Sequence, residues 1–330
     1  MKYSELKNNI IKEASKTNTP VLGEFELTSR CNFKCKMCYI EQVPQELTTE
    51  QWKSVFERAV LEGLMFALLT GGEAMLRKDF VELYEFLFDL GVKITVFSNG
   101  SIISDEIIKA FSKRPPELVA ISIYGASSKT YKKIARKTTG LDLLIEGIEK
   151  LQEHYINVSL RTLPLQEIYE ELDDIIGFAK ERDLILSYVT YLADSGGAHR
   201  ITNRLNHEQL IDFENRIKEA FHLNEKEDRA CEDCTYDCAA LSSGYYINHV
   251  GEMQACALAY KPKKSIIEND FLDTFHTLGK EMQKLNFKKT CKKCKLHSDC
   301  PICYAKRLYE TEKGCNSYLK NYAVKKRELS

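Results

Sequence analysis

Twelve cysteines are the residues whose type and spacing point most directly to chemistry in this 330-residue chain. Three of them, Cys31, Cys35 and Cys38, lie within eight residues of one another. Three thiols on one loop can converge on a single metal centre, and no fourth cysteine or histidine lies nearby to complete a structural zinc site. We therefore expect a redox-capable cluster with one open coordination position, at which a further ligand binds.

The other nine cysteines fall between Cys231 and Cys315. Four of these have the spacing Cys291-x2-Cys294-x5-Cys300-x2-Cys303, which taken alone is also typical of a four-cysteine zinc knuckle. The first twenty residues contain no apolar segment of signal-peptide length, so we expect a cytoplasmic protein. In that reducing compartment, tightly spaced cysteines favour metal ligands or catalysts over disulfides.

The composition indicates a globular protein with a full core, since 44% of the residues are hydrophobic and 29% are charged. Lys and Arg number 47 against 48 Asp and Glu, which leaves a formal charge of −1. No global charge favours nucleic acid or an anionic membrane, and the longest apolar stretch near the N-terminus, residues 64–69, is too short to span a bilayer. We expect neither as a partner.

Alternating strand and helix patterns must position these cysteines. Segments rich in β-branched and aromatic residues predict strands at 24–28, 64–70, 93–98, 118–124, 157–162 and 185–190. Apolar residues at helical spacing predict helices between them, one opening on a capping box at Thr48 and Gln51 and others at 79–90, 167–182 and 206–220. Six β-then-α units favour a parallel sheet but are too few for a closed eight-stranded barrel.

We therefore predict an α/β fold: a partial (β/α)6 TIM-like barrel, with sites at the carboxyl ends of its strands and a C-terminal cysteine-rich domain. The predicted divisions are an N-terminal extension (1–22), the barrel (23–205), a helical linker (206–230) and the cysteine-rich domain (231–330).

The segment RCNFKCKMCY, residues 30–39, resembles the cluster loop of the radical S-adenosylmethionine (SAM) enzymes. In that family three cysteines hold a [4Fe–4S] cluster, and its fourth iron binds the amino and carboxylate groups of the methionine moiety of SAM. The resemblance implies this role for Cys31, Cys35 and Cys38. It places Tyr39 where the family has an aromatic residue beside the adenine.

The second predicted strand ends in Gly71, Gly72 and Glu73, similar to the family's GGE segment, which holds the methionyl amino group. We expect the glycines to let the backbone approach the ligand closely and Glu73 to place a carboxylate near an ammonium. The alternative is a simple strand-to-helix turn.

Three later residues resemble cofactor contacts of the family. Ser98 and Ser122 stand at the ends of the third and fourth strands, where the family's side chains face the cofactor. Arg161, on the fifth strand, either meets the methionyl carboxylate or is an ordinary surface arginine.

The spacing Cys238-x12-Gly251-x4-Cys256 is similar to the opening signature of the SPASM extension, which holds two auxiliary [4Fe–4S] clusters. The loop between Cys300 and Cys303 is one residue shorter than is common there. Cys231 is left over: it replaces Cys234 as a ligand, is a bystander, or donates a hydrogen atom during radical epimerisation. The resemblance implies the ligand sets Cys234, Cys238, Cys256 and Cys303 for the nearer cluster and Cys291, Cys294, Cys300 and Cys315 for the farther one.

The cofactors implied are thus SAM and three [4Fe–4S] clusters, and the function implied is an enzyme that generates a 5′-deoxyadenosyl radical. Its expected substrate is a ribosomal peptide that receives a thioether or carbon cross-link or an epimerised residue. Only about 22 residues precede the first strand, so either a separate leader-binding protein assists or the peptide is recognised directly. An electron donor such as flavodoxin or ferredoxin is a further expected partner. Two alternatives stay open, a radical SAM enzyme that oxidises or epimerises a sugar or aminocyclitol, and a zinc or iron–sulfur scaffold without turnover.

Overall fold

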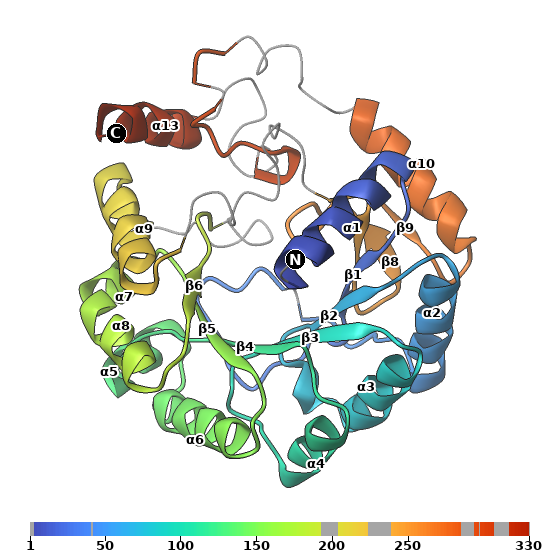
Figure 1. Cartoon of the computed structure of the whole chain (residues 1–330), viewed down its shortest axis with the longest axis horizontal. Helices are drawn as coiled ribbons and strands as arrows, with labels where there is room; N and C mark the ends of the chain where they lie inside the picture. The colour runs from blue at the N-terminus through green and yellow to red at the C-terminus, as the bar shows by residue number, and fades with distance from the viewer. Residues whose placement is uncertain are drawn as a thin grey trace.

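The computed structural model describes residues 3–40, 42–192, 204–223, 239–284, 294–296, 298–306 and 317–329. In these parts of the chain, nine strands form one curved sheet in the order β6-β5-β4-β3-β2-β1-β7-β8-β9 (Figure 1). The strand pairs from β6 through β1 to β7 are all parallel. The β7–β8 and β8–β9 pairs are antiparallel. The strands are Leu22–Glu26 (β1), Phe66–Thr70 (β2), Lys93–Ser98 (β3), Leu118–Ser122 (β4), Val158–Thr162 (β5), Leu186–Tyr188 (β6), Gly244–Ile247 (β7), Glu252–Gln254 (β8) and Lys263–Ser265 (β9).

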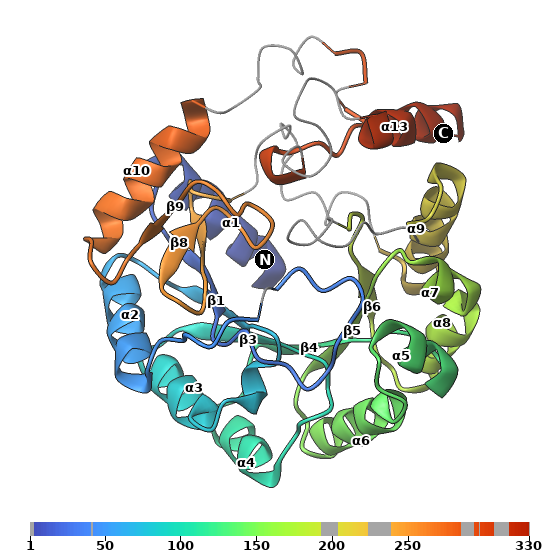
Figure 2. The same ribbon diagram turned by 180° about the vertical axis from the view of Figure 1, so that it is seen from behind.

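Helices that connect the parallel strands form a layer outside the curved sheet (Figures 1 and 2). This is the arrangement of a partial (β/α)6 barrel, so the predicted fold class is confirmed. The helices are α1 (Tyr3–Thr17), α2 (Thr49–Leu61), the short η1 (Ala74–Leu76), α3 (Phe80–Asp89), α4 (Asp105–Lys113), α5 (Ser128–Ile134), α6 (Gly140–Glu153), α7 (Gln166–Glu170), α8 (Leu172–Glu181), α9 (His207–Phe221), α10 (Phe271–Lys284) and α13 (Ser317–Leu329).

Aromatic side chains join the outer helices to the sheet. Phe25 of β1 meets Phe56 of α2 edge-on, with ring centroids 5.1 Å apart, and Trp52 stacks on Phe56. All three side chains are fully buried, and burial of each contributes about 1.5–3 kcal/mol. The predicted capping box at the start of α2 is present, with the Thr48 hydroxyl and the Gln51 amide satisfying each other's backbone N–H groups.

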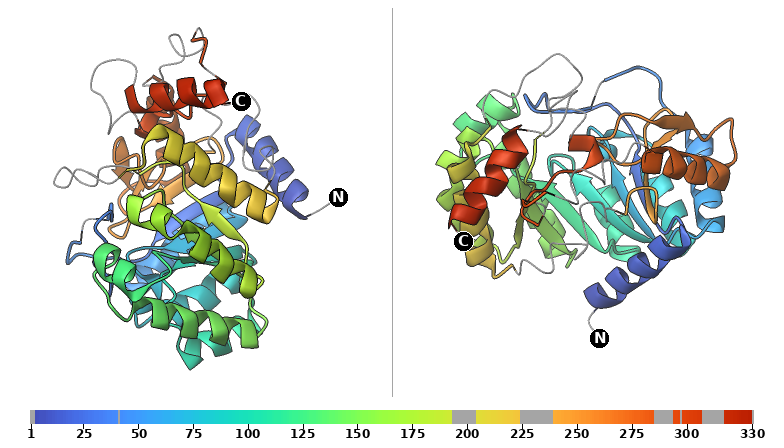
Figure 3. Two further views of the ribbon diagram at one scale, coloured as in Figure 1. Left: turned by 90° about the vertical axis from the view of Figure 1, so that its left-hand side faces the viewer. Right: turned by 90° about the horizontal axis from the view of Figure 1, so that it is seen from above.

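Helix α1 lies against the amino ends of the strands (Figure 3). Lys7 forms an ion pair of 2.7 Å with Glu117, just before β4, and Ser15 hydrogen-bonds to Ser243, just before β7. The sequence analysis treated this segment as an extension without assigned structure. Helix α1 thus covers the amino edge of the sheet. The loops of the predicted site lie at the opposite, carboxyl edge, because they follow the parallel strands.

Strand β7 adds a seventh parallel strand to the sheet, since it pairs with β1. It belongs to the region predicted as a separate cysteine-rich domain, so the sheet continues from the barrel into that region. The predicted helix 167–182 is two helices, α7 and α8, separated at Glu171, whose backbone (φ −109°, ψ 17°) leaves the helical region. No helix within the described ranges is long and apolar enough to cross a membrane.

Candidate active site

The cluster loop, residues 31–38, follows β1 and is fixed to the C-terminal end of α5. The backbone N–H groups of Lys34 and Lys36 donate to the carbonyl oxygens of Ala135 and Ile134, at 3.1 and 2.9 Å. The Lys36 ammonium donates to the Glu167 carboxylate at 2.6 Å, which ties the loop to α7 as well. These contacts hold the loop at the carboxyl edge of the sheet.

The three thiols of this loop differ in exposure. Cys31 and Cys35 are partly buried, and Cys38 is exposed. Burial raises the pKa of Cys31 to about 11 and that of Cys35 to about 12, and the neighbouring thiols add to the effect. The pKa of Cys38 is raised as well, by partial loss of hydration and by the negative charge of Glu26, although the side chain still reaches solvent. No group of three or more Cys, His, Asp or Glu side chains in the described part of the chain is arranged to hold a metal ion.

Gly71 and Gly72 allow a close approach of two backbone segments. A Cβ on Gly72 would lie 2.4 Å from the Arg30 carbonyl oxygen, and one on Gly71 would lie 2.5 Å from that of Thr28. The Gly72 N–H donates to the Thr28 carbonyl oxygen, and the Glu73 N–H donates to the Arg30 carbonyl oxygen, both at 2.9 Å. The predicted reason for the glycines was approach to a ligand. In the structure, the two glycines instead pack closely against the backbone of residues 28–30. The end of β2 thereby supports the start of the cluster loop.

The Glu73 carboxylate is buried at the carboxyl end of β2, with the residue only 1% exposed. It accepts hydrogen bonds from the backbone N–H groups of Asn99 (2.8 Å) and Met75 (3.2 Å) and from the Ser98 hydroxyl (3.0 Å). Burial nevertheless raises its pKa to about 7. No Lys or Arg of the described residues forms an ion pair with it, so a cationic ligand would stabilise its charged form.

Ser98 and Asn99, at the end of β3, connect Glu73 to the cluster loop. Ser98 was predicted as a direct cofactor contact; here its hydroxyl donates to Glu73. Sequence reasoning left Asn99 out of the site. Its amide donates to the Asn32 side chain at 2.9 Å and lies 3.8 Å from the Cys31 sulfur. The signal for it was present, since Asn99 belongs to the same strand ending as Ser98.

Arg161 lies on the inner wall of the barrel, paired in register with Ser122 of β4. It is partly buried, and its guanidinium stacks 3.9 Å from the centroid of the Phe97 ring. Arg161 is thus held against an aromatic ring, and its contact with the methionyl carboxylate stays a prediction. Burial lowers the pKa of Arg161, while Tyr39 and Glu24 oppose that effect, which places all three groups within electrostatic range of one another.

Glu24, on β1, is a charged residue of the inner wall that the sequence analysis missed. Burial raises its pKa to about 7, although the positive charge of Arg161 acts against this. Tyr39 has a pKa raised by burial and by the carboxylates of Glu26 and Glu24. The predicted adenine-side aromatic residue, which is 39% exposed, therefore lies within electrostatic range of two acidic residues and one arginine.

Four of the nine late cysteines lie in the described part of the chain. Cys256, Cys300 and Cys303 are partly buried, and Cys294 is exposed. The Gly251–Cys256 signature forms a hairpin: Gly251 turns between β7 and β8 with φ +84°, and Cys256 follows β8. The remaining predicted site cysteines, Cys231, Cys234, Cys238, Cys291 and Cys315, lie outside the described residues.

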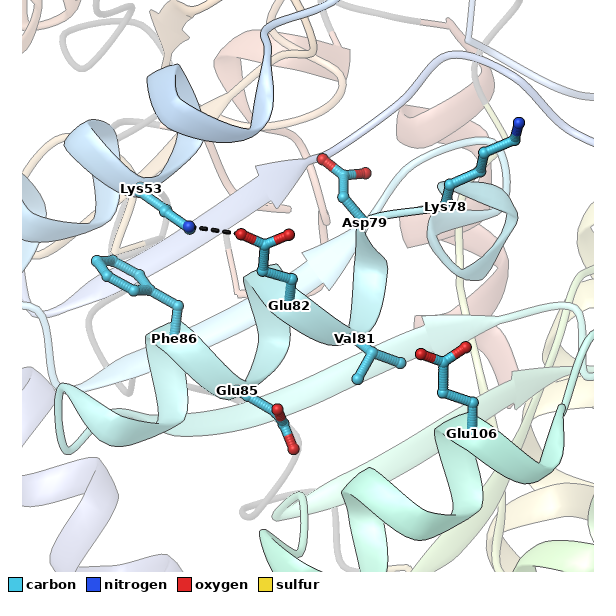
Figure 4. A pocket seen from close by; sticks show the side chains of 8 residues that line it. All are labelled: Lys53, Lys78, Asp79, Val81, Glu82, Glu85, Phe86 and Glu106. Carbon is cyan, nitrogen blue, oxygen red and sulfur yellow. Dashed lines mark hydrogen bonds and ion pairs between the residues drawn. The ribbon is translucent and has the colours of Figure 1, made fainter.

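A surface pocket lies in the outer helix layer rather than at this edge (Figure 4). Its lining includes Lys53 of α2, Glu82 and Phe86 of α3, and Glu106 of α4. Lys53 is already paired with Glu82 at 2.6 Å. No cysteine of the cluster loop contributes to the pocket, and we do not assign the site to it.

Comparison with known proteins agrees with this geometry. A family model described as the Radical SAM superfamily matches residues 25–179. The chain is 25% identical over 332 aligned residues to the antilisterial bacteriocin subtilosin biosynthesis protein AlbA of Bacillus subtilis, covering 92% of this chain and 72% of AlbA. It is 28% identical to the sporulation killing factor maturation protein SkfB of the same organism, covering 84% of this chain and 68% of SkfB.

The fold is similar to that of the crystal structure of SuiB from Streptococcus suis. The TM-score is 0.73 at 16% sequence identity, over 94% of this chain and 80% of SuiB. Residues 25–179 match the radical SAM superfamily model, and the similarity to these relatives supports an enzyme that uses SAM and an iron–sulfur cluster. The chain resembles the peptide maturases within that superfamily.

The donor types at the edge suit these cofactors, although the three thiols are not gathered into a metal-binding arrangement in this structure. Three thiols on one loop leave one iron of a [4Fe–4S] cluster open, and binding to iron stabilises the thiolate form that burial disfavours. The buried Glu73 carboxylate has no cationic partner among the described residues, which suits an ammonium group.

Proposed function

We propose that this chain modifies a ribosomally made peptide, installing a thioether or carbon cross-link or epimerising a residue. The observation that carries the proposal is the extent of the similarity to AlbA, which covers 92% of the chain and so extends far beyond the radical SAM domain at 25–179. AlbA is named for the biosynthesis of a bacteriocin and SkfB for the maturation of a sporulation killing factor. A structure of SuiB bound to its precursor peptide SuiA further supports a peptide substrate.

Residues of the carboxyl edge would hold the cofactors. Cys31, Cys35 and Cys38 are the proposed cluster ligands, and Glu73, held by Ser98 and the Asn99 N–H, is the proposed partner of the methionyl ammonium. When bound and reduced, the cofactors supply a radical able to remove a hydrogen atom from an unactivated C–H bond.

The remaining predicted cofactor residues surround the same opening. Arg161 and Ser122 are neighbours on β5 and β4; Arg161 is proposed to contact the methionyl carboxylate, and Ser122 is proposed to face the cofactor. Tyr39 is proposed to lie beside the adenine, and Gly71 and Gly72 hold Glu73 in place by bracing the loop. Because α1 covers the opposite edge of the sheet, substrate would enter from the side of these loops.

Two auxiliary [4Fe–4S] clusters are proposed for the C-terminal region. Cys256 follows the hairpin that extends the barrel sheet, so one ligand is attached directly to the barrel through β7 and β8. Cys231 stays a proposed spare ligand or hydrogen donor. A separate leader-binding protein and a flavodoxin or ferredoxin are proposed partners. The proposed ligand sets are Cys234, Cys238, Cys256 and Cys303, and Cys291, Cys294, Cys300 and Cys315.

Co-expression with short peptides encoded beside the gene, followed by mass spectrometry, tests the proposal. A loss of two hydrogens from a peptide indicates a cross-link or thioether, and an unchanged mass with deuterium uptake in heavy water indicates epimerisation. The matched control is the Cys31→Ala, Cys35→Ala, Cys38→Ala variant, which should leave every peptide unmodified. Conversion of a sugar or aminocyclitol with no modified peptide would contradict the proposal.

A further inference from the structure

A buried carboxylate, imidazole and phenol lie together at the junction of β1 and β7. The Glu26 carboxylate, at the end of β1, forms hydrogen bonds with the Tyr246 hydroxyl and with His249 Nδ1. The three residues are only 5%, 2% and 8% exposed. Neither the resemblance to radical SAM enzymes nor the sequence analysis assigned any of them a role.

The position of this group is at the cofactor edge of the barrel. β1 and β7 pair in parallel, with Phe25 opposite Ile247, so the residues just after both strands meet at the same edge. His249 is two residues past the end of β7, as the cluster loop follows β1. The Glu26 carboxylate also contributes to the raised pKa values of Cys38 and Tyr39, after burial, which places it beside the cluster loop.

One polar atom of this group has no partner. His249 Nε2 is buried and forms no hydrogen bond with any residue that the structure describes. An unsatisfied buried polar atom costs about 1–3 kcal/mol, so a group that reaches this edge and bonds to Nε2 would be stabilised there. Because Nδ1 is directed at a carboxylate oxygen, the favoured tautomer carries its proton on Nδ1 and has the lone pair on Nε2.

We propose that His249, oriented by Glu26, accepts a proton from the peptide substrate. This inference rests on the proposed peptide-modifying function. The bond that breaks is the S–H of the peptide thiol that becomes the thioether sulfur, and the bond that forms is Nε2–H on His249. The proton moves without an electron, the substrate atom keeps the bonding pair, and the resulting imidazolium is stabilised by the Glu26 carboxylate.

The first test uses the cofactor-free protein labelled with nitrogen-15 histidine. The long-range proton–nitrogen spectrum should show His249 with Nδ1 protonated and Nε2 unprotonated, assigned by the loss of its signals in His249→Gln. A protonated Nε2 with an unprotonated Nδ1 would overturn the proposal, because that nitrogen then has no lone pair to accept a proton.

The second test separates proton acceptance from a purely structural role. Reconstituted wild type and His249→Gln are reduced with dithionite, supplied with SAM and the peptide that wild type modifies in co-expression, and assayed for 5′-deoxyadenosine and modified peptide. We expect 5′-deoxyadenosine within about twofold of wild type and modified peptide reduced at least about tenfold, since general bases contribute about 10²–10⁴-fold. Imidazole should restore part of the modification in His249→Ala.

The controls distinguish the outcomes. His276→Gln, on the partly exposed side of α10, should match wild type in both products, because its ring contacts the Asn18 carbonyl and the Phe275 ring and no residue of the proposed site among those described. Equal losses of both products in His249→Gln, or no loss of modified peptide, would overturn the role of His249 alone. Absence of any modified peptide with wild type would overturn the proposed function itself.

Discussion

Replacing Glu167 by Gln should destabilise the protein even before a cofactor binds. The Glu167 side chain is 3% exposed and accepts the Lys36 ammonium at 2.6 Å and that of Lys133 at 3.0 Å. Burial alone would raise the pKa of this carboxyl, but the hydrogen bonds from Lys36, the backbone and Lys133 outweigh burial and hold the pKa at about 2. Glu167 therefore joins α7 to both the cluster loop and α5.

The size of the effect follows from this pKa. Lowering it from 4.5 to about 2 corresponds to at most about 3.4 kcal/mol of unfolding free energy at neutral pH. The Lys36 and Lys133 side chains are 24% and 60% exposed, so water screens part of the interaction. We expect Glu167→Gln to lose about 1–2 kcal/mol. Because the folded pKa is depressed, the stabilisation is complete above about pH 5 and is lost as the pH falls from about 4.5 toward 2.

Urea unfolding of the cofactor-free protein, followed by circular dichroism at pH 7 and pH 4, measures this difference. The gap between wild type and Glu167→Gln should be smaller at pH 4. Glu170→Gln, whose carboxylate contacts Gln166 on the surface of α7, is the matched control and should change stability little. Equal stability of wild type and Glu167→Gln at pH 7, or a gap that widens at pH 4, would refute the reasoning.

Three further changes probe the core and the cofactor edge. Gly72→Ala should lower both the melting temperature and the iron content after reconstitution, because its Cβ would lie 2.4 Å from the Arg30 carbonyl; normal values of both would contradict the bracing role. Glu73→Gln should weaken SAM binding at least about tenfold in calorimetry, since a charge-assisted hydrogen bond is lost. Phe56→Ala should cost about 3–5 kcal/mol of unfolding free energy, because it leaves a cavity beside Phe25; a loss below about 1 kcal/mol would show that the core closes around it.

The barrel was predictable because its elements carry strong local signals. Six predicted strands match β1 to β6, with ends displaced by no more than a few residues, and the capping box at Thr48 marked the start of α2 correctly. Helix α1 escaped prediction because its charged sequence packs little apolar surface, with Ala14 as its one buried residue. The break between α7 and α8 also has no local signal. It is linked to a tertiary contact, since the Glu171 carboxylate binds the backbone of Ala126 and the hydroxyl of Ser127.

The site was predictable only where residue types form a motif. The cysteine spacing and the GGE segment indicated the carboxyl edge. Asn99 donates its backbone N–H to the Glu73 carboxylate, and a backbone contact leaves no signature in the residue type. Glu26 and His249 are 223 positions apart and meet only because β7 pairs with β1. Pairing between distant strands cannot be read from local periodicity.

Release of 5′-deoxyadenosine tests the central claim most directly. Anaerobically reconstituted enzyme, reduced in the presence of SAM, should release 5′-deoxyadenosine and bind about twelve iron atoms per chain if the two auxiliary clusters are present. The variant with alanine at Cys31, Cys35 and Cys38 should bind about four fewer iron atoms and release none. Reconstituted wild type that binds zinc instead of iron, or that holds its full iron content and leaves SAM intact under reduction, would contradict the account.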